Sequence, residues 1–156
     1  MAYSVLMTTD QNAVAIPSRG AEELVVPLSS FGADAGSLVG GKAANLGELL
    51  RAGLPVPGGF AVTTATYTIA AEIAGIPSLL SNPDIQPVNL RAALRSVEIP
   101  LNIREQIIAA YRLLGDDVPV AIRSSATAED LPGAAFAGQQ DTYLNIVGSE
   151  DRKSVV

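Results

Sequence analysis

The sequence predicts one compact domain that mixes strands with helices, of the α/β or α+β class. A length of 156 residues suits a single domain. Hydrophobic residues make up 48% of the chain and charged residues 17%, which is enough apolar material for a core. Short segments that alternate apolar with other residues occur among longer segments with the period of a helix.

Composition and charge exclude several classes of function. The formal net charge of −6 would repel a phosphate backbone, so nucleic-acid binding is not expected. The absence of cysteine excludes disulfides and thiolate metal sites, and fits a reducing cytoplasm. The absence of histidine removes serine–histidine triads and phosphohistidine carriers. No signal peptide and no apolar run of about 18 residues is visible, so a soluble cytoplasmic protein is expected, with no membrane partner.

The elements are predicted from periodicity and from the residues that begin and end them. Gly53 followed by Pro55 is typical of a helix end, and Pro100 and Gly115 bracket another helix. In order, we expect a disordered tail (1–22), an edge strand (24–28), a glycine-rich loop (29–41), a helix from 42 that ends before 53, a strand (60–62), a helix (64–75), a connection (76–87), helices at 88–97 and 101–114, and strands at 118–123 and 142–146.

The first candidate site is Gly40-Gly41-Lys42, where two glycines lead directly into a predicted helix. The free N–H groups at a helix start can face an anion, and glycine lets the backbone approach a phosphate. Lys42 would lie in the first turn, where the helix dipole disfavours a cation unless an anion is bound. The alternative is a solvent-exposed lysine after a flexible turn. The spacing is not that of a Walker A motif.

The second candidate site is Arg123 with Ser124 and Ser125, at the carboxyl end of a predicted strand. A guanidinium flanked by hydroxyls matches phosphate oxygens, and ligands often bind at the carboxyl ends of strands. The alternative is an edge arginine beside an ordinary turn. Glu129 and Asp130 follow Thr127 with a spacing that favours a helix cap over a pair of catalytic carboxylates.

The segment between the strands predicted at 118–123 and 142–146 offers further polar groups. Its Gly138 allows close backbone approach, and the amides of Gln139 and Gln140 and the hydroxyl of Thr142 suit a base, a ribose or a phosphate. Glutamine-rich turns of this kind are usually solvated, so the loop alone is a weak signal.

Together these segments resemble a known family. LVGGKAANLGELLRAGLPVPGGFAVTTATY and VAIRSSATAEDLPGAAFAGQQDTYLNI resemble the N-terminal nucleotide-binding domain of phosphoenolpyruvate synthase (pyruvate, water dikinase). The wider family includes pyruvate phosphate dikinase and rifampicin phosphotransferase. The resemblance covers about residues 24–147. The second motif resembles the synthase and rifampicin-phosphotransferase branches more than it resembles the dikinase that uses inorganic phosphate.

The resemblance implies an α+β, ATP-grasp-like fold of which this chain holds the N-terminal part, over residues 23–148. It implies that Lys42 and Arg123 contact the phosphates of ATP, and that Gly138 and Thr142 belong to a loop that closes over the nucleotide. Ser124, Gln139 and Gln140 are less certain members of this site. ATP is the expected ligand.

The resemblance also implies what would lie beyond residue 156. This includes the second lobe with its acidic Mg²⁺ ligands, the domain with the phosphorylated histidine, and the domain that binds pyruvate. We therefore expect no complete set of catalytic residues and no metal ligand in this chain. The chain alone should not catalyse the complete reaction. Residues 149–156 resemble no family segment and suggest a truncation. The missing lobe would leave apolar surface exposed, which favours self-association.

Two alternatives to the synthase remain open. One is a fragment of a rifampicin-phosphotransferase-like enzyme, which would share the ATP half and differ in the acceptor. The other is a non-catalytic product or subunit that works only beside a partner carrying the remaining domains.

Overall fold

A computed structural model describes residues 2–7, 24–125 and 142–148. Its described part contains one antiparallel sheet, with strands in the order β2-β3-β1-β4-β5. The strands are β1 (Ala2–Met7), β2 (Val25–Pro27), β3 (Gly59–Val62), β4 (Val120–Ser125) and β5 (Thr142–Ile146). The mixture of helix and antiparallel sheet confirms the predicted α+β class.

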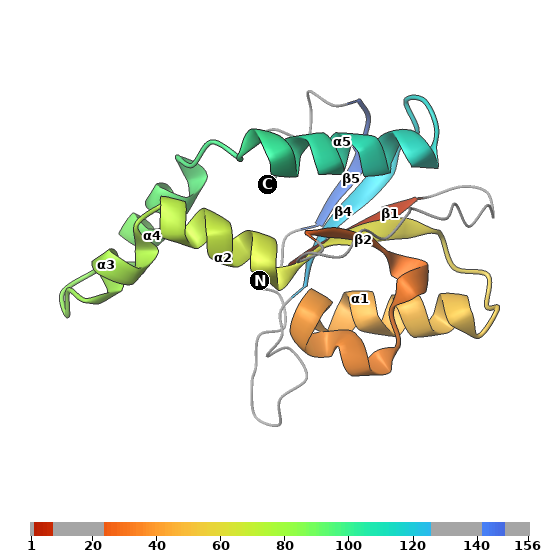
Figure 1. The fold of residues 1–156 in the computed structure, drawn as a ribbon, viewed down its shortest axis with the longest axis horizontal. Helices are drawn as coiled ribbons and strands as arrows, with labels where there is room; N and C mark the ends of the chain where they lie inside the picture. The colour runs from red at the N-terminus through yellow and green to blue at the C-terminus, as the bar shows by residue number, and fades with distance from the viewer. Residues whose placement is uncertain (1, 8–23, 126–141, 149–156) are drawn as a thin grey trace.

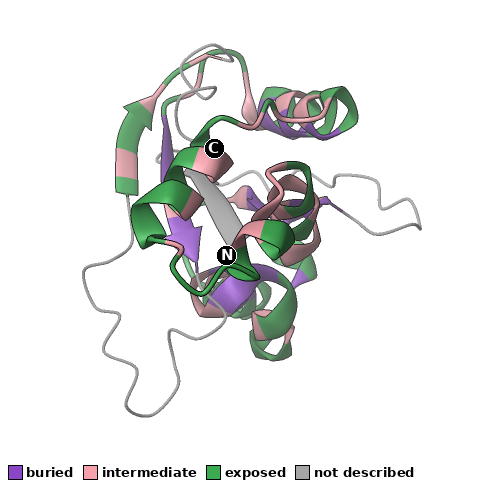
Figure 2. Cartoon of the chain, turned by 90° about the vertical axis from the view of Figure 1, so that its left-hand side faces the viewer, coloured by how far each residue is buried: buried purple, intermediate pink, exposed green. Residues whose placement is uncertain are grey.

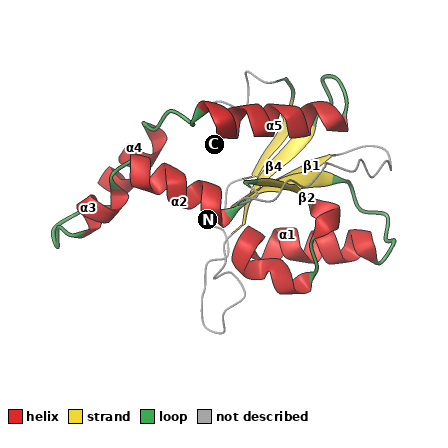
Figure 3. Cartoon of the chain, in the orientation of Figure 1, coloured by secondary structure: helices red, strands yellow, loops and turns green. Residues whose placement is uncertain are grey.

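Helices cover both faces of the sheet (Figure 1). Helix α1 packs on one face and α5 on the other, while α2, α3 and α4 extend away from the sheet as an arm (Figure 3). The helices are α1 (Gly36–Arg51), α2 (Thr64–Ile73), α3 (Ile76–Leu80), α4 (Pro87–Arg95) and α5 (Leu101–Leu114), with short 3-10 turns at Leu28–Ser30 and Ala33–Ala35. None of the helices in the described ranges is long and apolar enough to cross a membrane.

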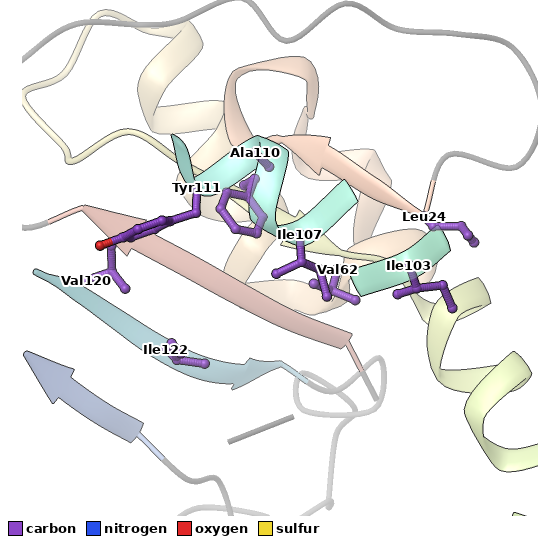
Figure 4. Close-up of a cluster of buried hydrophobic side chains, with 9 residues drawn as sticks. Leu24, Val62, Ile103, Ile107, Ala110, Tyr111, Val120 and Ile122 are labelled. Atoms are coloured by element: carbon purple, nitrogen blue, oxygen red, sulfur yellow. The ribbon is translucent and has the colours of Figure 1, made fainter. Parts of the chain in front are cut away.

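The core between α5 and the sheet is built from large apolar side chains (Figure 4). Residues of one parity on β3 and β4 point into it, because successive side chains of a strand alternate between the two faces. Its buried members are Leu24, Phe60, Val62, Ile103, Ile107, Ala110, Tyr111, Val120 and Ile122.

The core between α1 and the sheet contains smaller side chains. Ala61 of β3 and Ala121 of β4 meet Ala43 and Ala44 of α1, and all four are buried. Small residues on both sides let the helix backbone approach the sheet closely. In Figure 2, buried residues lie on strands of the sheet and on parts of the helices, and exposed residues cover much of the remaining helical surface.

The first strand corrects the prediction for the N-terminus. Residues 1–22 were expected to form a disordered tail, but Ala2–Met7 forms the central strand and pairs with β3 on one side and β4 on the other. Both partners are distant in the sequence, so the local pattern of residues 1–22 carries no sign of them. A strand of six residues is also too short to show a sustained alternation of apolar and polar residues.

Two further segments differ from their predictions. The loop expected over residues 29–41 contains two 3-10 turns and the first part of α1, which begins at Gly36. The connection expected over residues 76–87 contains α3, with Pro77 in its first turn, where proline is tolerated. The helix over residues 101–114 has the predicted bounds.

Tyr111 joins α5 to one end of the β4–β5 pair, where β4 begins and β5 ends. Its hydroxyl donates to the carbonyl oxygen of Val118 at 2.8 Å and accepts from the backbone N–H of Gly148 at 3.2 Å. The Tyr111→Phe variant should lower the free energy of unfolding by about 1–2 kcal/mol, since it leaves two backbone groups without this partner. Urea denaturation measures this loss. Tyr67→Phe is the control, because the Tyr67 hydroxyl makes no hydrogen bond within the described ranges, and an equal loss there would contradict the prediction.

Candidate functional site

Helix α1 is kinked at Gly40. This residue has φ 78° and ψ 160°, a backbone conformation found essentially only in glycine, so the helix is interrupted and starts again at Gly41. The first N–H groups of a helix lack acceptors within it, and its N-terminal end carries a partial positive charge. Lys42 is half-buried in the first turn after this kink, as the sequence predicts.

Strand β4 presents Arg123 to the same face as α1. Val120 and Ile122 belong to the core under α5, whereas Ala121 belongs to the core under α1. Strand alternation therefore sends Arg123 and Ser125 to the α1 face, together with Ala121. Ser124 has the opposite parity and lies on the α5 face, away from the Arg123 side chain.

The kink of α1 touches the end of β4. A Cβ atom added to Gly40 would lie 2.8 Å from the Cβ of Ser125 and 3.0 Å from its carbonyl carbon, and it would overlap the Ser125 hydroxyl. Only glycine leaves room for this contact. Lys42 follows Gly40 by two residues and Arg123 precedes Ser125 by two, so the contact brings the two predicted phosphate-binding motifs together.

Two buried polar atoms on this face have no hydrogen-bond partner within the described part of the chain. They are Nε of Arg123 and Oγ of Ser125. Buried polar atoms are nearly always paired, and an unpaired one costs about 1–3 kcal/mol. Both atoms can donate a hydrogen bond, and the Ser125 hydroxyl lies against Gly40, where the second part of α1 starts. The arrangement therefore fits an oxyanion such as a phosphate group.

Thr142 lies directly beside Arg123. The two residues are partners in the antiparallel pairing of β4 with β5, so their side chains share one face with Cβ atoms about 5 Å apart. Thr142 is exposed, which leaves its hydroxyl accessible on that face. The predicted site residues Gly138, Gln139 and Gln140 lie outside the described residues.

Neighbouring elements hold both sides of the kink. The Thr64 hydroxyl, at the start of α2, donates to the carbonyl oxygen of Ser37 in the first part of α1 at 3.2 Å. Val39 and Ala43, which flank the kink, are fully buried. The position of the Lys42 turn is therefore fixed by packing on the sheet and by α2.

The sequence places Ser125 in the second candidate motif without distinguishing it from Ser124, and it does not predict the kink at Gly40. Strand alternation could have found the serine, since extending the predicted strand by two residues places Arg123 and Ser125 on one face. No sequence signal predicts that Gly40 meets this serine, because the contact joins segments that lie far apart in the chain.

A known protein family matches most of the chain. The family model described as "Pyruvate phosphate dikinase, AMP/ATP-binding domain" matches residues 36–156. This range includes the kinked helix, the arm, α5, β4 and β5.

Similar curated proteins carry the name phosphoenolpyruvate synthase. A probable phosphoenolpyruvate synthase of Methanothermobacter thermautotrophicus is 47% identical over 78% of this chain and 20% of its own length. The synthase of Aeropyrum pernix is 41% identical over 82% of this chain and 18% of its own length. The synthase of Helicobacter pylori is 41% identical over 74% of this chain and 17% of its own length. The chain thus spans about a fifth of these relatives, and it belongs to the pyruvate phosphate dikinase AMP/ATP-binding domain family.

Proposed function

We propose that this chain supplies the phosphate-binding part of the ATP site of a phosphoenolpyruvate-synthase-like dikinase. The full-length enzyme would convert ATP, pyruvate and water into phosphoenolpyruvate, AMP and phosphate. The observation that carries the proposal is the contact between Gly40 and Ser125, because it joins the helix start at Lys42 to the strand end at Arg123. The names of the relatives support the choice of reaction.

The residues of this chain would act by positioning and by neutralising charge. Lys42 would supply a compact positive charge at the helix start, and Arg123 a planar fork of donors that matches two phosphate oxygens. The hydroxyl of Thr142 would offer a further hydrogen bond beside Arg123. Bound ATP would supply the phosphoryl group, and phosphoryl transfer depends mainly on such positioning and charge stabilisation.

Other parts of the proposal concern a longer protein. The ATP-grasp-like arrangement places ATP between two lobes, with the acidic Mg²⁺ ligands on the lobe that this chain does not contain. Pyruvate and the phosphorylated histidine would likewise belong to further domains. Because this chain has no histidine, it would bind ATP without completing the reaction.

Calorimetric titration of the full 156-residue chain with ATP tests the proposal. We expect wild-type binding, and a weakening of about tenfold or more in both Lys42→Ala and Arg123→Ala, because each removes a charge-assisted hydrogen bond. Arg91→Ala is the matched control. It removes a positive charge from an exposed position on α4 in the arm, so ATP affinity should not change.

Thermal denaturation of each variant shows whether a loss of binding reflects loss of fold. Arg123→Lys adds a further comparison, since it retains the charge but loses the fork, and it should bind between the wild type and Arg123→Ala. Equal ATP binding by wild type, Lys42→Ala and Arg123→Ala would contradict the assigned phosphate roles. Absence of ATP binding by the wild type would contradict the proposed function of this chain.

A further inference from the structure

We propose that Ser125 is a fourth side chain of the phosphate site, beside Lys42, Arg123 and Thr142, and that its hydroxyl donates a hydrogen bond to a phosphate oxygen when the nucleotide binds. The inference rests on the proposed function and adds a contact to it. It begins from the Ser125 hydroxyl, which is buried and has no partner in the described ranges.

Comparison with another buried hydroxyl shows what is unusual about Ser125. Thr66 is also buried, and its hydroxyl donates to the carbonyl oxygen of Leu24 at 2.9 Å. Thr66 therefore contributes to the fold with its hydrogen bond satisfied. The side chain of Ser125 is 0% exposed, yet its oxygen is one of the two buried side-chain polar atoms left unpaired within the described residues.

The surroundings of the Ser125 hydroxyl point to an anion. It lies against Gly40, where the second part of α1 starts and its N-terminal end carries a partial positive charge. The other unpaired atom, Nε of Arg123, lies on the same face of β4, one strand repeat away. Guanidinium and helix N–H groups only donate hydrogen bonds, and a serine hydroxyl can do so too. This set of donors suits an oxyanion and excludes a cation.

Ser125 is buried against Gly40, so a phosphate oxygen reaches its hydroxyl only through a local change of the Gly40 backbone that leaves the buried Val39 and Ala43, and with them the Lys42 turn, in place. Glycine allows this change, because it can adopt backbone conformations that other residues rarely do. As far as the described residues show, the free chain thus carries the cost of an unpaired hydroxyl, and nucleotide binding removes that cost. This predicts that removal of the hydroxyl stabilises the free chain and weakens nucleotide binding.

The experiment compares Ser125→Ala with wild type in the full chain. Alanine retains the Cβ that packs on Gly40 and removes only the oxygen. We expect the Tm of the free chain to rise by about 2–4 °C. The Kd for ATP should increase about tenfold, and that for inorganic pyrophosphate similarly, because the contact is to the phosphate chain.

Thr66→Val is the matched control, since it removes a buried hydroxyl that has a partner and lies outside the phosphate site. It should lower the Tm and leave the Kd for ATP unchanged. The inference is overturned if wild type binds ATP and Ser125→Ala binds equally well. It is also overturned if Ser125→Ala weakens ATP binding but not pyrophosphate binding. Failure of the wild type to bind ATP would instead overturn the proposed function, and this inference with it.

Discussion

Replacing Gly40 by alanine is expected to lower the free energy of unfolding by about 2–6 kcal/mol and to abolish measurable ATP binding. About 1–3 kcal/mol arises because φ 78° with ψ 160° is strained for any residue with a side chain. A further 1–3 kcal/mol, roughly, arises because the new methyl group overlaps Ser125 at the end of β4. Binding fails because relief of the overlap moves the Lys42 turn away from Arg123.

Gly53→Ala separates these two contributions. Gly53 also has a positive φ, of 73°, but an added Cβ meets nothing within 4 Å. This variant therefore carries backbone strain alone, which costs about 1–2 kcal/mol, and it lies outside the phosphate site. Urea denaturation and ATP titration of both variants provide the comparison. If Gly40→Ala loses no more stability than Gly53→Ala, and both bind ATP as wild type does, the close contact with Ser125 does not position the site.

The sequence predicts those parts of the fold that depend on local signals. Pro100 at the start and Gly115 at the end bracket α5, and the predicted bounds agree with the structure. The strand that ends near Arg123 is also predicted, because Val120 and Ile122 alternate with smaller residues. In both elements, the residues that decide the structure are neighbours in the sequence.

Contacts between distant segments could not be predicted in the same way. Strand β1 owes its place to backbone pairing with β3 and β4, which its own residues do not reveal. The kink at Gly40 was hidden because consecutive glycines indicate only that the backbone is free, while the contact with Ser125 determines which conformation it takes. Motif reasoning selected Lys42 and Arg123, but the residues that bring them together emerge only from the fold.

Gly47 provides the second prediction with a large expected effect, since it fixes α1 against the turn that precedes it. An added Cβ would lie 2.5 Å from the carbonyl oxygen of Leu28 and 2.8 Å from both the Cβ and the carbonyl oxygen of Phe31. Two of these atoms belong to the backbone of buried residues, so they cannot move aside as the end of a flexible side chain can. Gly47→Ala should therefore lower the free energy of unfolding by about 1–3 kcal/mol.

Gly36→Ala is the control in the same helix, and it should have the opposite sign. An added Cβ at Gly36 meets nothing within 4 Å, and its φ of −55° is helical. Alanine there restricts the unfolded chain and should stabilise the protein by about 0.4–1 kcal/mol. Gly47 has no positive φ either, so helix propensity alone would predict stabilisation at both positions. Stabilisation by Gly47→Ala in urea denaturation would contradict the proposed packing. Destabilisation would show that close approach of α1 to the preceding turn outweighs propensity, and ATP affinity should then fall with it, because the same helix carries Lys42.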